Sequence, residues 1–232
     1  MKKLAILLGV LSLMALPYKG ISQKYKNREI TLIQFNVTIQ PEIKKQLDQL
    51  ESKFPETKNK NIDPIIAKIK EESWELIFEK LQHDVGMLVM PINTLGDQIS
   101  YDVYGFPDVG ITKAQKKGAT KYYMKVDLQI GPELYQYATS TSKDKKENTP
   151  QRVILNSDEI KPVVTITLTT FPTNGIIPLN KYIGSIVAPN VLKVDASILD
   201  GLVNDTIKND KSTLMSLIAA SVEELTLSIL TD

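Results

Sequence analysis

Residue types that could do chemistry gather in one segment, Asn93 to Asp108, where acids alternate with aromatic residues. The residues concerned are Asp97, Tyr101, Asp102, Tyr104, Phe106 and Asp108. Carboxylates beside aromatic rings are suited to binding a sugar, a peptide or a hard cation such as calcium. The Asp-x-Asp-x-Asp-Gly order of a calcium loop is absent from the segment. The sequence therefore predicts a ligand site here without naming the ligand.

The same residues also fit two other interpretations. Aromatic side chains can pin a long loop onto a sheet while aspartates cap its turns, which would make the segment structural. Alternatively, Asp97 and Asp102 could form the carboxylate pair of a glycan hydrolase, because two acids brought together by folding leave no local spacing signal. All three interpretations stay open at the level of sequence.

Other catalytic chemistries find little support. The chain has no cysteine and one histidine, His83, so thiol catalysis is excluded and a zinc site would consist almost wholly of carboxylates. No Gly-x-Ser-x-Gly or glycine-rich phosphate loop occurs. We expect His83 to lie at a helix end, near the terminal carbonyls. The sequence thus predicts no catalytic residue, no metal and no cofactor.

The first 22 residues have the pattern of a secretory signal peptide. Met1-Lys2-Lys3 precedes an apolar run from Leu4 to Leu16, and small residues follow up to Ser22. An apolar run of about 13 residues is too short to span a bilayer, which takes about 20. We expect cleavage after residue 22 and a soluble bacterial protein, periplasmic or secreted. Without cysteine it cannot be a lipoprotein, and no transmembrane segment is expected in the mature chain.

Charge excludes one class of partner. The full chain carries 28 basic and 27 acidic residues, and removing the leader takes away Lys2, Lys3 and Lys19, which leaves a net charge of about −2. Nucleic-acid binding normally needs a basic stripe and a higher isoelectric point. We expect no nucleic-acid partner.

Hydrophobic periodicity predicts the elements that must position the acidic aromatic segment. Alternation over residues 29–39 predicts a strand with Thr31, Ile33, Phe35, Val37 and Ile39 on one face. The continuously apolar run 86–92 is typical of a strand at the centre of a sheet. Further strands are expected at 122–130, 152–155 and 162–171, and helices at 41–54, 64–83, 111–117 and 211–230.

Capping residues mark several of these boundaries. Asp63 and Pro64 are expected to open the long helix, Gly118 to close the short one, and Ser212 to cap the last. Trp74 should pack the long helix against the sheet. The order of elements predicts an α/β (α+β) fold, with one mixed sheet of about five strands packed by three to four helices. We expect a single domain over residues 23–232, with an exposed polar loop at 139–151.

The last predicted helix is apolar over more of its surface than one narrow stripe requires. Burial would explain most of this surface. The alternative is that Met215, Val222 and Leu227 are left for a partner or for self-association.

The segment Lys117-Gly118-Ala119-Thr120-Lys121-Tyr122-Tyr123, which leads from a short helix into a strand, and the order of elements around it resemble known periplasmic domains. The chain is similar in this respect to the α/β domains of the curli-assembly lipoprotein and of the TolB amino-terminal type, and to uncharacterised secreted envelope proteins of gliding bacteria. The resemblance implies an envelope assembly role and assigns no functional residue. We therefore expect an exported, non-enzymatic envelope protein that binds another envelope protein or itself.

Overall fold

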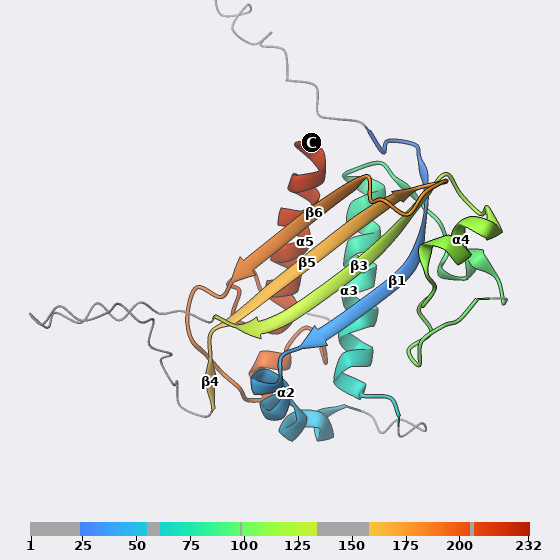
Figure 1. Ribbon diagram of the computed structural model, residues 1–232. Helices are drawn as coiled ribbons and strands as arrows, with labels where there is room; N and C mark the ends of the chain where they lie inside the picture. The colour runs from blue at the N-terminus through green and yellow to red at the C-terminus, as the bar shows by residue number, and fades with distance from the viewer. Residues whose placement is uncertain (1–23, 55–60, 98, 134–157, 205–206) are drawn as a thin grey trace, which may run out of the picture.

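The computed structural model describes residues 24–54, 61–97, 99–133, 158–204 and 207–232 (Figure 1). Its strands are β1 (Glu29–Ile39), β2 (Leu88–Val89), β3 (Tyr122–Pro132), β4 (Glu159–Ile160), β5 (Pro162–Pro172), β6 (Asn180–Val187) and β7 (Leu192–Lys193). Its α-helices are α2 (Pro41–Leu47), α3 (Pro64–His83), α4 (Ile111–Lys117) and α5 (Leu214–Leu230). Three short 3-10 helices join them, η1 (Asp48–Lys53), η2 (Ile92–Leu95) and η3 (Ala196–Leu199).

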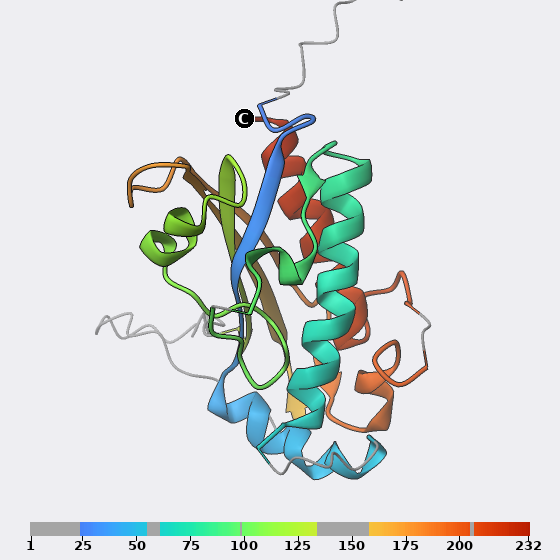
Figure 2. The same ribbon diagram turned by 90° about the vertical axis from the view of Figure 1, so that its right-hand side faces the viewer.

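The main sheet has five strands in the order β2-β1-β3-β5-β6. β1 runs parallel to both β2 and β3, whereas β5 is antiparallel to β3 and β6, so the sheet is mixed. Figure 2 shows this sheet from its edge, with α3 and α5 on one side and α4 on the other. The predicted α+β class, with about five strands and four helices, is confirmed.

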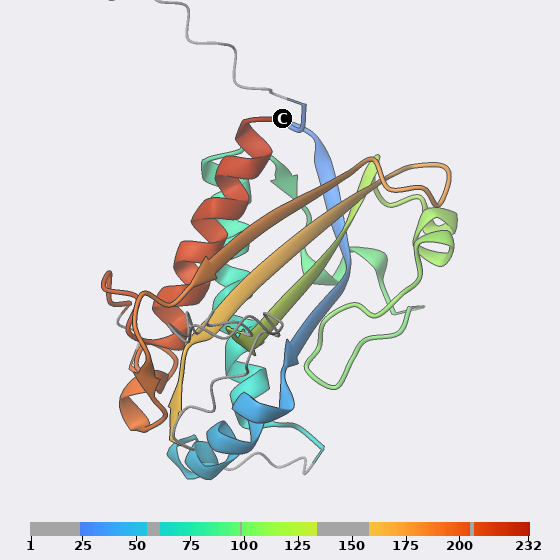
Figure 3. The same ribbon diagram turned by 60° about the vertical axis from the view of Figure 1, so that its left-hand side comes forward.

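Strands β3 and β5 follow the predicted alternation. On β3, Met124, Val126, Leu128 and Ile130 are fully buried under the helices. On β5, Thr165, Thr167 and Thr169 alternate with buried apolar positions and are half-buried on the other side of the sheet. Figure 3 shows β5 lying between β3 and β6. A period of two places the apolar half of each strand in the core, because successive side chains point to opposite faces.

The predicted face of β1 is wrong at Thr31 and Ile33, the two positions that precede Phe35 on that face. The pairing of β1 with β3 shifts register between Leu32 and Gln34, and this bulge turns Ile33 away from Phe35. Ile33 packs instead with Tyr123 in a small second cluster beside α4, while Phe35 belongs to the main core. An extra residue in a strand shifts the alternation by one, which periodicity alone does not reveal.

The run 86–92 is not the central strand that its apolar composition predicts. It contributes the two residues of β2 at the edge of the sheet, and Leu88 there is 46% exposed. Its apolar character has another cause, since Met87 and Val89 are buried in the main core. Apolar composition reports burial, and burial at a sheet edge can come from a covering helix as well as from flanking strands.

Helix α3 begins and α4 ends as the sequence predicts. Asp63 caps α3 by accepting hydrogen bonds from the backbone N–H groups of Ile65 (2.9 Å) and Ile66 (3.0 Å). Gly118 ends α4 in the left-handed conformation, at φ +63°, which glycine adopts without strain. The predicted helix 41–54 is α2 followed by η1.

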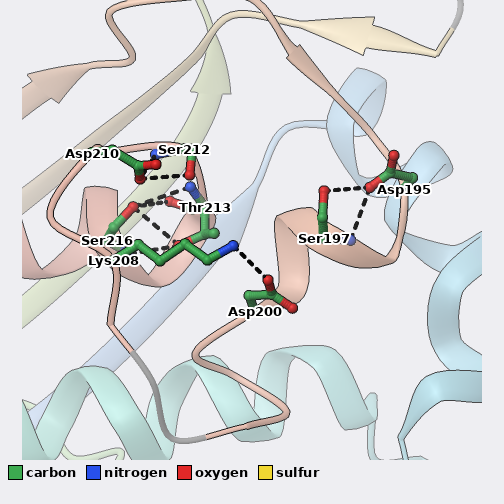
Figure 4. Close-up of polar contacts among 8 residues, drawn as sticks. All are labelled: Asp195, Ser197, Asp200, Lys208, Asp210, Ser212, Thr213 and Ser216. Atoms are coloured by element: carbon green, nitrogen blue, oxygen red, sulfur yellow. Dashed lines mark hydrogen bonds and ion pairs between the residues drawn. The ribbon is translucent and has the colours of Figure 1, made fainter.

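The predicted cap of α5 is wrong by one residue. Thr213, not Ser212, is the N-cap, and it forms a capping box with Ser216 in which each side chain accepts the other's backbone N–H at 3.1 Å (Figure 4). Ser212 donates instead from its N–H (3.0 Å) and its hydroxyl (2.6 Å) to Asp210. Ser212 and Thr213 both carry a hydroxyl group that can cap a helix. Which of them does so depends on the backbone conformation of the chain that enters α5, and the sequence does not specify it.

Met215 and Val222 do not belong to an interaction surface, because both are buried in the main core. Leu227 is 54% exposed and alone of the three faces outward. The difference arises because α5 packs against both the sheet and α3. Its approach to β6 is so close that a Cβ on Gly184 would overlap the backbone of Ser221.

Three predictions fall outside the described residues: the leader 1–22, the loop 139–151 and the strand 152–155. Among the helices of the described ranges, none has the length and apolar composition needed to cross a bilayer.

Candidate functional site

The acidic aromatic segment leaves the sheet after β2 and returns to the edge of β1. At its end the Val109 N–H donates to the Ile33 carbonyl (3.1 Å), and the Gln34 side-chain amide donates to Asp108 Oδ1 (2.8 Å). The segment thus takes the place beside β1 that β2 leaves when it ends. This anchoring carries residues 101–106 towards α3 (Figure 2).

An ion pair between a buried lysine and a partly buried aspartate ties the segment to α3. Lys70 is buried, and its Nζ donates to the Phe35 carbonyl (2.7 Å) and to Asp102 Oδ2. The other carboxylate oxygen, Oδ1, accepts the backbone N–H groups of Tyr104 and Phe106, each at 2.9 Å. Both oxygens of Asp102 therefore have partners, and this carboxylate holds the loop in shape.

Aromatic rings enclose the lysine. Its Nζ lies 5.0 Å from the ring centroid of Tyr104, 5.3 Å from that of Phe106 and 5.6 Å from that of Phe35. Phe106 in turn meets the rings of Phe35 (5.2 Å) and Trp74 (6.2 Å) edge to face. Such contacts favour both the buried cation and the packing of the loop. Trp74 is buried in the core as the sequence predicts.

On its outer side the segment forms one wall of a groove whose other wall is α3. The cavity measures about 630 Å³, within the range of small-ligand and peptide side-chain pockets. Its apolar lining comes from Phe54, Ala67, Trp74, Ile92, Val103 and Phe106. Three charged residues of α3 border it: Lys68, Glu71 and Glu75. We call this cavity the apolar groove.

A second cavity of about 340 Å³ adjoins the apolar groove at Tyr104, which lines both. Its other lining residues are mostly polar and include Asn36, Thr38, Asp127 and Gln129. We call it the polar pocket. Two cavities of different character thus meet on either side of one tyrosine.

The electrostatics of the two cavities differ. Around the apolar groove, Lys68 Nζ bonds to Glu72 (2.5 Å) and Glu71 (3.1 Å), and the hydrogen bond to Glu72 is the main reason that the pKa of Lys68 is raised. In the polar pocket, Asp127 pairs with Lys125 (3.4 Å) and accepts from the Asn36 amide (2.8 Å).

Tyr104 stays neutral between the two cavities. Burial raises the pKa of its hydroxyl, so the phenol keeps its proton at physiological pH.

The six residues predicted as a site are not brought together. Tyr104 and Phe106 line the apolar groove, and Asp102 lies beneath it in the ion pair with Lys70. Tyr101 packs against the second cluster and donates to the Gly96 carbonyl (3.3 Å). Asp108 is bonded to β1, and Asp97 is exposed.

Sequence reasoning missed the α3 half of the groove. Ala67, Glu71 and Glu75 lie at successive spacings of four, one helical row, with Trp74 beside them. The spacing of this row is visible in the sequence, but the sequence does not indicate which loop packs beside it. Among the described residues, no group of three or more acidic or histidine side chains could hold a metal ion, and His83 lies exposed in the last turn of α3.

Neither a protein-family model nor a curated protein sequence matches the chain. Among solved structures, the chain is similar to the hypothetical protein CT253 from Chlamydia trachomatis, with 11% identity, 88% of this chain and 98% of that chain covered, and a TM-score of 0.40. It is also similar to a putative neuraminyllactose-binding hemagglutinin homolog from Helicobacter pylori, with 11% identity, 88% and 86% covered, and a TM-score of 0.34.

Proposed function

We propose that this chain is an exported, non-enzymatic binding protein that holds an apolar part of a partner protein in the apolar groove. The observation that carries the proposal is the groove itself, a cavity of about 630 Å³ walled by aromatic and aliphatic side chains at the segment singled out by its sequence. Export is supported by the leader pattern of residues 1–22.

The mouth of the apolar groove is suited to contact with another molecule. Val103 stands at the groove with 53% of its surface exposed, while Trp74 and Phe106 behind it are buried. An exposed aliphatic residue in front of buried aromatic walls resembles the pockets into which partner side chains insert at protein interfaces.

The hydrolase alternative receives less support from the geometry. A general acid or nucleophile needs a carboxylate oxygen free to meet the substrate. Both oxygens of Asp102 are already engaged, by Lys70 and by two backbone N–H groups. Asp102 thus acts as a structural residue, which leaves the proposed pair with Asp97 incomplete.

Site-directed photo-crosslinking tests the proposal. A photoreactive side chain at Val103, in the exported protein within its host envelope, should form an adduct with a discrete partner protein. The matched control places the same group at Ile177, which is 78% exposed in the segment between β5 and β6. Equal adducts at both positions, or none at Val103, would contradict the proposal.

A second variant separates groove binding from mere proximity. Ala67→Trp should fill the apolar groove and abolish the adduct at Val103 while the protein stays folded, as judged by its denaturation midpoint. An adduct that persists would mean that the partner does not enter the groove. Export is tested by amino-terminal sequencing of the mature protein, which should begin near Gln23; a start at Met1 would contradict it.

A further inference from the structure

We infer that the occupant of the apolar groove is an extended peptide segment in which a large apolar side chain lies next to a basic residue, and that this segment crosses Tyr104 into the polar pocket. The inference rests on the proposed function and names the class of partner. It draws on the charges that border the groove, the position of Tyr104 in the lining of both cavities and the chemistry of the polar pocket.

The charges beside the groove favour a cationic neighbour for the apolar anchor. Glu71 and Glu75 are exposed one turn apart on α3, and both border the groove. The single basic residue among its lining, Lys68, is already bound to Glu71 and Glu72. The lining therefore carries one more negative charge than positive, which attracts a lysine or arginine and repels phosphate or carboxylate groups.

Tyr104 lines both cavities, so an extended ligand that passes over this one side chain reaches both. Ile66 and Lys70 of α3 line the polar pocket, whereas Ala67 and Glu71, each one residue further on, line the apolar groove. Both cavities thus follow the same turns of α3. An extended chain that lies across Tyr104 would place neighbouring residues in chemically different surroundings.

The lining of the polar pocket favours a ligand group that is polar and uncharged. Its charged members already have partners, Asp127 with Lys125 and Lys70 with Asp102. Thr38 and Gln129 are exposed there and offer a hydroxyl and an amide. A peptide backbone or an amide side chain supplies matching neutral donors and acceptors. A lipid phosphate or a fatty acid would bring an unpaired negative charge instead.

Random heptapeptides displayed on phage and selected on the purified mature protein provide the test. We expect selected sequences to share a large apolar residue beside lysine or arginine, with no acid adjacent. Synthetic peptides without tryptophan are then titrated, and emission from Trp74 is the readout, because this sole tryptophan lines the groove.

Charge variants measure the basic preference. The double reversal Glu71→Lys with Glu75→Lys should weaken binding of a basic peptide about tenfold, the equivalent of roughly 1.4 kcal/mol. Glu79→Lys, an exposed glutamate of α3 outside the groove, should leave the dissociation constant unchanged. Gln129→Leu should weaken binding about threefold through the polar pocket.

Several outcomes would overturn the inference. Selected peptides without a basic preference, together with an unchanged affinity in the double reversal, would reject the partner class while leaving groove binding intact. A full effect of the reversal with none from Gln129→Leu would reject the crossing of Tyr104. A shift of Trp74 emission with octyl glucoside and none with any peptide would identify a neutral amphiphile instead. In each case an adduct at Val103 would still uphold the proposed function, so the two failures are distinguishable.

Discussion

Two lysines of α3 stand two residues apart and have opposite surroundings. The side chain of Lys70 is 5% exposed and binds Asp102 and the Phe35 carbonyl beneath three aromatic rings. The side chain of Lys68 is 31% exposed and binds Glu71 and Glu72 of its own helix. Both form ion pairs, but only the first joins two parts of the chain that are distant in sequence.

The difference shows how much burial decides the role of a charge. Removing one partner of a buried ion pair leaves the other charge without solvent, which costs several kcal/mol, whereas a surface pair is worth about 0 to 1 kcal/mol. We therefore assign to Lys70 the placement of the loop, and to Lys68 a minor part in stability and a part in the charge of the groove.

The largest expected effect is that of Lys70→Ala. It removes the charge that neutralises Asp102 and the stem that packs under the rings of Tyr104 and Phe106, so we expect a loss of about 3–5 kcal/mol in the free energy of unfolding. Urea denaturation measures it. Lys70→Met keeps the apolar stem and should lose less. A loss below 1 kcal/mol for Lys70→Ala would mean that Lys70 contributes no more to stability than Lys68, which would contradict the assignment.

The next effect separates the two tasks of Asp102. Asp102→Ala removes both the ion pair and the acceptor of two backbone N–H groups, and we expect it to cost about 2–4 kcal/mol. Asp102→Asn keeps an oxygen for the backbone N–H groups of Tyr104 and Phe106, so it should cost less. Equal losses in urea denaturation would show that the loop needs only the charge. Emission from Trp74 reports whether the groove changes.

A small effect is expected from Lys68→Ala. Exposed pairs on one helix contribute little, so the free energy of unfolding should change by less than about 0.5 kcal/mol in 0.15 M salt. The same variant in 1 M salt should differ even less from the unmodified protein, because salt screens exposed charges. A loss comparable to that of Lys70→Ala would contradict the assignment.

The smallest effect is the pH dependence of Lys68. Its pKa is raised in the folded protein, chiefly by the hydrogen bond to Glu72. A raised pKa means that the folded state holds the proton more tightly, so the stabilisation is complete below the unfolded value of about 10.4 and is lost as pH rises through the folded value. The difference in stability between Lys68→Ala and the unmodified protein should therefore be smaller at pH 11 than at pH 8. Denaturation midpoints at pH 8 and 11 test this, and an effect that grows with pH would refute it.

Local sequence determined most of the elements. Alternation placed β1, β3 and β5, the pair Asp63 and Pro64 marked the start of α3, and Gly118 marked the end of α4, because each depends on neighbours in the chain. The sequence did not predict the bulge at Ile33, since a bulge depends on how two strands pair. Nor did it predict that β2 lies at the edge of the sheet, because the apolar character of Met87 and Val89 does not reveal which element covers them.

The candidate site shows the same division. By itself the sequence determined that residues 97–108 bring acids and aromatic rings together in one segment, and that residues 64–83 form a helix that begins after Asp63. Only the tertiary structure decided that Asp102 turns inward to Lys70 while Tyr104 and Phe106 line a groove with Trp74. The reason is physical: a carboxylate binds a ligand or neutralises a buried lysine according to which charge folding brings beside it. That neighbour lies 32 residues away along the chain.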